Sequence, residues 1–450
     1  MELIIPWLVG LFSLLCLGAI FFAAWRKTGI WFNPASLFAM AWVVYVAVPL
    51  LIGFGVDFNP AAAIYIVFFV FCFSLTVFGM QWSVVVDQNK FKVLLGGIFS
   101  HKSLIYFFLL LLVLAVIFHL LDLSAQGLAV NFDALSSAGE YASRRYAGEL
   151  NENIFQKLAL LASFQVVVFG GLVFGGASRR SGKIIVLLLA FIPSVLVMLL
   201  QSAKGLLFLS AALFIGAWLV TRVFANDFRL PQVPLVPVLL GVLVLFGLVV
   251  ASFVARFGSD VDILRYYLAS YSSGHFFAFS DWFSDRYFGG ALFRGYDQSE
   301  LQVGFYTFMG FFRALGDARP VPLGVYDEYF VIDGVLTTNI YTAFRGLIVD
   351  FGLFGSLLFA VSAGFVANLS FYFLLCKRFA VTAVVIFIYM VGVIYQSYVV
   401  SSLTWISVPV SAAISVALIL LFRMSMRYSI VLGKSRVSEV INLSGGACDS

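Results

Sequence analysis

The feature that most constrains this chain is a series of long apolar segments, each close to the roughly 20 residues that one helix needs to cross a bilayer. Eleven such runs cover residues 3–25, 36–54, 62–82, 103–121, 155–176, 184–200, 205–221, 234–255, 346–375, 380–397 and 404–422. Only 11% of the residues are charged, against about a quarter in soluble domains. This excludes a soluble enzyme, a nucleic-acid-binding protein and a disordered chain. We predict an all-α polytopic membrane protein with about 11 transmembrane helices and the lipid bilayer as its surroundings.

The basic residues predict how the chain is oriented. Arg26 and Lys27 directly follow the first run, and no basic residue precedes it. On this assignment the inside segments hold sixteen of the 27 basic residues but only four of the 22 acids. Because Lys and Arg concentrate in cytoplasmic loops, we expect a periplasmic N-terminus and a cytoplasmic C-terminus. The four cysteines then lie in helices or on the reducing side, so no disulfide is expected.

Two segments are too long to be simple connections between helices. We expect helices 1–8 in residues 1–255, with a periplasmic loop at 122–153, and a large periplasmic loop at 256–338. Helices 9–11 follow in residues 339–422, and a cytoplasmic tail in 423–450. The large loop contains 21 aromatic residues, ten acids and six basic residues. Loops of this length in a compact protein are usually functional.

All the basic residues of the large loop are arginines: Arg256, Arg265, Arg286, Arg294, Arg313 and Arg319. The planar guanidinium binds phosphate or carboxylate in a bidentate manner. An interfacial belt with structural ion pairs is the alternative, but such a belt does not need ten acids. Lys204 and Arg345 open two of the apolar runs on the same side, where they indicate an anion site; snorkelling to the interface is the alternative.

Residues 262–287 have the apolar spacing of a helix that lies on or dips into the outer leaflet, with a Ser-Gly break in the middle. His275 is the only histidine in an outside loop. It is a candidate general base, because its side chain titrates near neutrality; a packed, hydrogen-bonded histidine is the alternative. Asp260 and Asp262 form a DxD pattern, which we interpret as acids at a helix start and not as a metal site.

Four segments carry a resemblance to a known family: NPASLFAMAWVVYVAVPLL (33–51), SAKG (202–205), YYLASYSSGHFFAFSDW (266–282) and TTNIYTAFRGLIVDFGLFGSLLF (337–359). Together with the number of runs and the large outer loop, they resemble the bacterial O-antigen polymerases, the Wzy-type oligosaccharide repeat-unit polymerases. The likeness covers most of the chain.

The resemblance implies a GT-C-like membrane glycosyltransferase of the bacterial inner membrane. Such an enzyme joins undecaprenyl-diphosphate-linked oligosaccharide repeat units into O-antigen or a related surface polysaccharide at the periplasmic face. It implies no cofactor and no metal, and a polysaccharide chain-length regulator as a possible partner. An O-antigen ligase and a flippase or transporter of lipid-linked glycan are the alternatives.

The same resemblance suggests roles for individual residues. Arginines aimed at the diphosphate would stabilise the leaving group, and a base would take the proton of the attacking hydroxyl. We expect Arg345, Arg256 and Lys204 to bind the diphosphate, Asn339 and Tyr341 to orient the diphosphate, and Arg265 to contact the substrate. The expected base is His275, with Glu328 and Asp281 as substitutes. Trp282 and Tyr287 are expected to stack on sugars.

Overall fold

The computed structural model describes residues 4–83, 102–127, 144, 153–201, 204–231, 235–288, 302–320, 325, 326, 328–376 and 380–424. Most of the loop expected at 122–153 and most of the tail expected at 423–450 lie outside these residues. The side chain of Arg256 lies outside them too.

Every apolar run of the sequence forms a helix. The helices are α1 (Ile4–Thr28), α2 (Pro34–Ile52), α3 (Pro60–Gly79), α6 (Lys102–Ala125), α8 (Ile154–Gly176), α9 (Arg180–Gln201), α10 (Lys204–Phe224), α11 (Leu235–Phe257), α14 (Thr342–Leu375), α15 (Ala380–Gln396) and the Ser407–Met424 helix. Within the described part of the chain, nine helices are long and apolar enough to cross a membrane. The prediction of an all-α polytopic membrane protein is confirmed at this level.

The large loop between α11 and α14 contains ordered elements. They are α12 (Val261–Phe288), α13 (Met309–Ala314) and an antiparallel hairpin of β1 (Phe330–Ile332) and β2 (Leu336–Thr338), in which Phe330 pairs with Thr338. A short 3-10 helix, η1 (Ser402–Thr404), precedes the last helix. The helix expected at 262–287 is present, but it continues through its Ser-Gly pair without a break, and its second half is buried against α2, α3, α14 and β2.

Asparagine caps determine where α2 and α3 begin. The Asn33 side chain accepts a hydrogen bond from the Ser36 amide at 2.9 Å, and Asn59 accepts one from Ala61 at 2.9 Å. Each asparagine is followed by a proline in the first turn of the helix. The asparagine satisfies a free amide, and proline at the first helical position loses no hydrogen bond. Both helices therefore start at positions that the sequence specifies locally.

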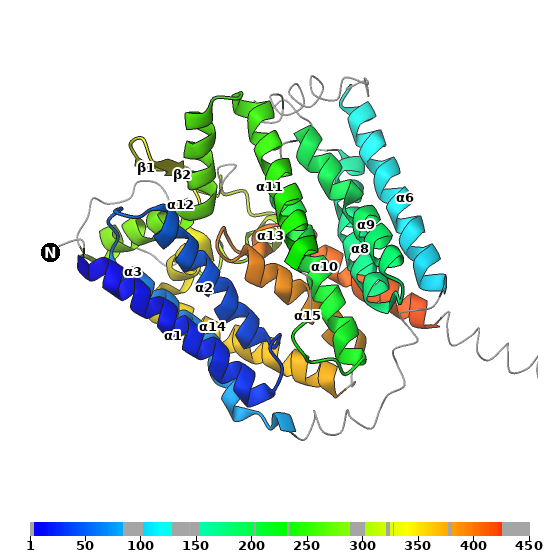
Figure 1. Cartoon of the computed structure of the whole chain (residues 1–450), viewed down its shortest axis with the longest axis horizontal. Helices are drawn as coiled ribbons and strands as arrows, with labels where there is room; N and C mark the ends of the chain where they lie inside the picture. The colour runs from blue at the N-terminus through cyan, green and yellow to red at the C-terminus, as the bar shows by residue number, and fades with distance from the viewer. Residues whose placement is uncertain are drawn as a thin grey trace, which may run out of the picture.

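The helices form two packed groups (Figure 1). In one group α1, α2 and α3 pack on each other, and α2 and α3 also pack on α14; in the other group α8 packs on α6, α9 and α10. Helix α15 joins the groups, because it contacts α10, α14 and α2. At one of the tightest contacts, a Cβ on Gly364 of α14 would lie 1.9 Å from the Phe73 carbonyl oxygen of α3. Small residues let transmembrane helices approach this closely.

A buried polar cluster attaches the Ser407–Met424 helix to its neighbours. The Gln165 amide of α8 donates to the Ser411 hydroxyl at 2.9 Å and accepts from Ser415 at 2.8 Å. The Tyr389 hydroxyl of α15 lies 2.6 Å from the Ser411 hydroxyl. Because an apolar solvent gives little drive for helices to associate, such interhelical hydrogen bonds help to fix the arrangement.

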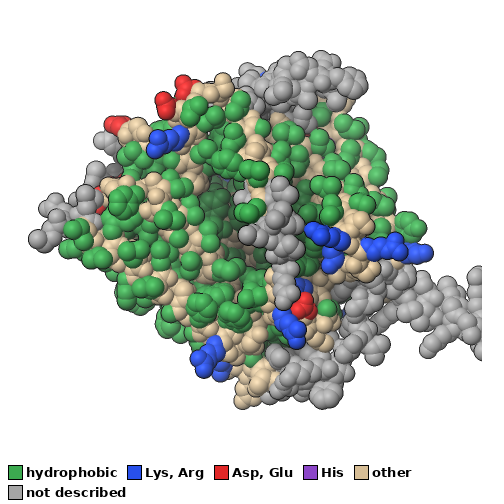
Figure 2. All heavy atoms as spheres, in the orientation of Figure 1, with side chains coloured by type: hydrophobic (Ala, Val, Ile, Leu, Met, Phe, Trp, Pro, Cys, Tyr) green, Lys and Arg blue, Asp and Glu red, His purple; other side chains and the backbone are tan. Residues whose placement is uncertain are grey.

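The surface agrees with a membrane location. Figure 2 shows a face that is predominantly hydrophobic, with Lys and Arg side chains mainly in the lower half of the view, toward which α1 runs. The start of α12 and the β-hairpin lie at the top. We refer to this end of the bundle as the α12 end.

Candidate functional site

Helix α14 is broken near its start. Gly352 has φ 71° and ψ 176°, a backbone conformation that is open almost only to glycine. The first ten residues therefore form a separate half-helix, residues 342–351. It begins four residues after the end of β2, and Arg345 lies in its first turn. Because a helix N-terminus carries partial positive charge, a cation there needs a reason beyond the helix itself.

Arg345 is completely buried, at 0% exposure, and is surrounded by aromatic rings. Its guanidinium carbon lies 4.1 Å from the ring centre of Tyr326, 4.3 Å from that of Tyr341 and 5.4 Å from that of Trp282. Desolvated cation–π contacts contribute about 2 kcal/mol each. These three rings, the aromatic cluster, hold the guanidinium in one place and shield it from water.

Glu328 forms an ion pair with Arg345. Its Oε2 accepts from the Arg345 Nη2 at 3.0 Å, and the Glu328 side chain keeps 18% of its exposure while Arg345 keeps none. Tyr341 donates its hydroxyl to the Glu328 carbonyl at 3.3 Å, and the Asn339 side chain donates to the Tyr326 carbonyl at 3.3 Å. Asn339 and Tyr341 therefore hold the segment that carries Tyr326 and Glu328.

The other end of the half-helix is attached to the chain before α13. Asp350, at 1% exposure, accepts hydrogen bonds from the Tyr306 amide at 3.0 Å, the Thr307 amide at 2.6 Å and the Thr307 hydroxyl at 2.6 Å. These are charge-assisted bonds to a buried carboxylate. We call this set of bonds the Asp350 clasp. It fixes the half-helix at its C-terminal end, opposite Arg345.

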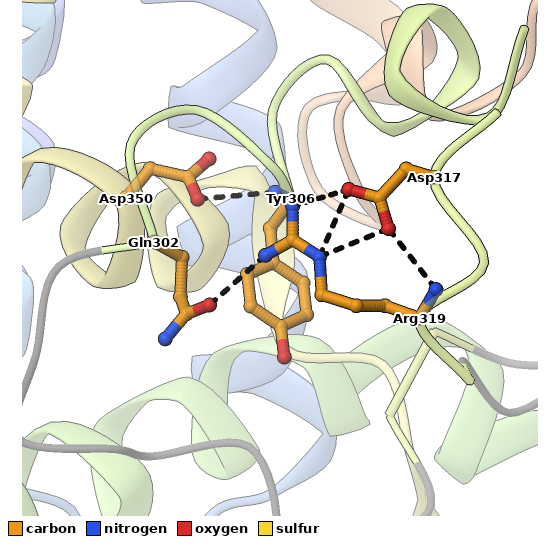
Figure 3. A network of polar contacts seen from close by, with 5 residues as sticks. All are labelled: Gln302, Tyr306, Asp317, Arg319 and Asp350. Atoms are coloured by element: carbon orange, nitrogen blue, oxygen red, sulfur yellow. Dashed lines mark hydrogen bonds and ion pairs between the residues drawn. The ribbon is translucent and has the colours of Figure 1, made fainter. Parts of the chain in front are cut away.

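Arg319 links the chain after α13 to the chain before it (Figure 3). Figure 3 shows the Arg319 guanidinium between the Asp317 carboxylate and the Gln302 side chain. The guanidinium also lies 3.6 Å from the ring centre of Phe305. The hydrogen bonds from Arg319 hold the pKa of Asp317 below its usual range. Arg319 therefore stabilises this loop through its ion pair with Asp317 and its hydrogen bond to Gln302.

His275 lies in a different environment. Its Nε2 donates to the Tyr45 carbonyl at 2.9 Å, and its ring packs against Tyr398 at 5.1 Å between centres. Burial lowers the pKa of His275 to about 4, although the hydrogen bond to Tyr45 opposes this. A neutral imidazole with this pKa is a weak proton acceptor. The packed, hydrogen-bonded interpretation of His275 fits this geometry better than the general-base hypothesis.

Two of the three expected diphosphate ligands, Lys204 and Arg345, have described side chains, whereas the Arg256 side chain lies outside the described residues. Lys204 is 7% exposed, and its Nζ lies 3.2 Å from the ring centre of Phe253 and 5.1 Å from that of Tyr271. Arg345 touches α12 at Trp282, three helical turns beyond Tyr271, up to about 16 Å along a straight helix. Lys204 and Arg345 therefore contact α12 at different positions. Arg265 is exposed near the start of α12.

The two aromatic residues expected on sugars differ in their surroundings. Trp282 is completely buried in the aromatic cluster, so that it packs on Arg345. Tyr287 is 39% exposed on the last turn of α12, and its ring centre lies 4.9 Å from that of Phe283 with the two rings tilted. Asp281, the other substitute base, lies beside this cluster; burial and the neighbouring Asp285 raise its pKa.

An apolar cavity of about 650 Å³ lies on another side of the half-helix. It is bounded by α14, α15, the Ser407–Met424 helix and phenylalanines of α2 and α3. The cavity is partly open to the surface, and apolar side chains form almost all of its lining.

The site contains residues that sequence reasoning missed. Tyr326 provides the ring nearest to the guanidinium, and Thr307 provides two of the three donors of the Asp350 clasp. Neither residue carries a local signal, because both become important through contacts with a helix that starts many residues later.

Comparison of the chain with protein-family models, with curated proteins and with solved structures found no match.

Proposed function

We propose that this protein is a membrane glycosyltransferase of the GT-C type that polymerises undecaprenyl-diphosphate-linked repeat units into O-antigen or a related surface polysaccharide. The proposal places it in the bacterial inner membrane with the α12 end and the N-terminus in the periplasm. Its first support is the resemblance of four segments to the Wzy-type polymerases. Its second support is the buried Arg345–Glu328 pair.

The observation that carries the proposal is a fully buried guanidinium at the first turn of a broken membrane helix. Ionisable groups at membrane depth are functional candidates by default. Half-helix N-termini in discontinuous membrane helices point at anionic groups of substrates. Arg345 adds a fixed cation to such an N-terminus, and Glu328, its partner, is the member of the pair that reaches the surface. A diphosphate approaching past Glu328 would meet both positive elements.

In the proposed reaction, a hydroxyl of one lipid-linked glycan attacks the anomeric carbon of another. The new bond joins that carbon to the hydroxyl oxygen, while the bond from the carbon to the diphosphate breaks. The diphosphate takes the bonding electrons, and Arg345 stabilises its charge. The hydroxyl proton goes to Glu328. This assigns the base to Glu328 in place of His275, whose Nε2 is engaged by the Tyr45 carbonyl.

The ion pair gives this mechanism a switch between two states. In the structure Arg345 neutralises Glu328 at 3.0 Å. A bound diphosphate competes for the guanidinium, and because a carboxylate that loses a cationic neighbour becomes more basic, Glu328 becomes the better proton acceptor when the donor substrate is present. Asn339 and Tyr341 hold this segment by its backbone, so they position the base.

The test is elongation by the purified full-length protein in lipid nanodiscs, with lipid-linked repeat units and no ion gradient. We expect a ladder of products from the wild type. Arg345→Lys keeps the charge but loses the planar fork, so we expect at least a hundredfold slower elongation, and Glu328→Gln should lose a similar factor. Arg313→Lys, at an exposed arginine of α13, is the matched control and should elongate normally.

The outcomes separate the alternatives. Wild-type rates in Arg345→Lys would remove Arg345 from the site. Absence of elongation with transfer of finished polymer to a lipid A core acceptor would favour a ligase. Translocation of the lipid-linked unit without any elongation would favour a flippase or transporter. In cells, loss of a polymerase leaves single units on the surface, whereas loss of a ligase leaves polymer on the carrier.

A further inference from the structure

We propose that the apolar cavity between α14, α15 and the Ser407–Met424 helix is a binding site for one hydrocarbon chain of a membrane lipid. Its walls are almost entirely aliphatic and aromatic side chains. Three of its four sides are helices that are long or apolar enough to lie within the bilayer. The solvent that reaches such a cavity is lipid, and a linear chain is the part of a lipid that matches this lining.

The length of the cavity matches one leaflet. Along α15 its lining runs from Val385 to Ile394, which is about 14 Å at the helical rise. The hydrocarbon core of a bilayer is about 30 Å thick, so one leaflet provides roughly 15 Å of chain. A single extended chain therefore fills the cavity from end to end, with its polar head at one end only.

The polar end of the cavity lies just beyond the C-terminus of α15. Thr307, Ser397, Ser401 and Ser402 lie there, and the Ser401 hydroxyl donates to the Thr307 carbonyl at 2.8 Å. The Ser402 hydroxyl is the informative one. Ser402 is 1% exposed and lines the cavity, yet its Oγ makes no hydrogen bond with any residue that the structure describes. Buried hydroxyls are nearly always bonded, so the head-proximal oxygen of a lipid is the partner that completes it.

This site is distinct from the Arg345 site. Ala343 and Leu347 of the half-helix line the cavity, whereas Arg345 lies two residues from each of them. Two residues correspond to about 200° around a helix, so Arg345 faces away from the cavity toward Tyr326 and Tyr341. The half-helix is a shared wall, and a chain in the cavity braces it from the side opposite the guanidinium. The inference does not require glycosyl transfer.

A filling variant tests the site. Ala412 lines the cavity on the last helix, and Ala417 on the same helix is exposed and does not line it. Native mass spectrometry of the purified full-length protein should show one retained lipid in the wild type and in Ala417→Trp. In Ala412→Trp, which places an indole in the cavity, retention should fall at least tenfold. Wild-type retention in Ala412→Trp, with its melting temperature and elution volume unchanged, would overturn the proposal.

Photolabelling of the wild type keeps the proposal testable if Ala412→Trp does not fold. The probes are phosphatidylglycerol and a polyprenyl phosphate, each with a diazirine in its hydrocarbon chain. We expect adducts on the cavity face of α15 between residues 385 and 394, and the probe that labels there identifies the source of the chain. Adducts confined to lipid-facing positions such as Leu358, which is 70% exposed, would show annular contact only and refute the site.

Discussion

The Asp350 clasp provides the sharpest prediction about how the candidate site is held. Asp350→Ala removes the acceptor of three hydrogen bonds and leaves the amides of Tyr306 and Thr307 and the Thr307 hydroxyl buried. Each buried donor without a partner costs about 1–3 kcal/mol. If one of these three donors finds a new partner through local relaxation, two remain unpaired, and the free energy needed to open this segment falls by about 4 kcal/mol.

Hydrogen exchange measures this loss locally. A change of about 4 kcal/mol corresponds to roughly a thousandfold faster exchange, so amides in residues 302–308 should exchange about a thousandfold faster in Asp350→Ala than in the wild type. Thr307→Val removes only the hydroxyl and should accelerate exchange by about tenfold. The measurement uses mass spectrometry of peptides from the protein in detergent micelles.

A matched control separates the clasp from a general loss of negative charge. Asp333 is an exposed acid in the hairpin turn, and Asp333→Ala should leave exchange in 302–308 unchanged. Unaltered exchange in this segment for Asp350→Ala would refute the reasoning. A uniform increase across α8 and α10 would mean instead that Asp350 supports global stability and not this loop.

Two further predictions concern stability. Gly364→Leu places a Cβ 1.9 Å from the Phe73 carbonyl oxygen. Because the backbone cannot move away easily, we expect about 3 kcal/mol of destabilisation in equilibrium unfolding. Gly18→Leu, whose Cβ meets nothing within 4 Å, is the control, and equal stability of the two variants would contradict the close contact. His275 has its pKa lowered from 6.5 to about 4, so as pH falls the unfolded chain takes up the proton first. The free energy of unfolding should decrease by about 1.4 kcal/mol per pH unit between these two values, about 3 kcal/mol in all, and be fully retained above the higher one. His275→Phe should remove this slope, and an unchanged slope would show that His275 is not buried as described.

The helices could be predicted from the sequence because the signal is local. Each apolar run specifies its own helix, and Asn-Pro pairs at 33–34 and 59–60 specify where two of them begin. The prediction of α12 was correct in type but not in surroundings. Its apolar spacing predicted a helix on or in the outer leaflet, whereas contacts with α2, α3 and α14 bury its second half.

The candidate site was predictable only in part. Arg345 stands out because a charge in an apolar run is rare. Its partner Glu328 was one of several acids in the loop, and nothing in the spacing distinguishes it from Asp281. The grouping of Arg345 with Lys204 relied on their being at the same end of the bundle, but the sequence does not say that three turns of α12 lie between their contacts. Distances across a long loop depend on tertiary packing that no local pattern records.

The break at Gly352 has a consequence for how this chain tolerates change. A continuous helix of 34 residues would extend about 51 Å, far beyond the hydrocarbon core of about 30 Å. In such a rod, inserting or deleting one amino acid would rotate the portions on its two sides by about 100° relative to each other. With the rod interrupted, a length change in residues 353–375 alters the register of that portion alone and leaves Arg345 aimed at Glu328. The two portions can therefore diverge independently, one adapting to membrane thickness and the other to chemistry.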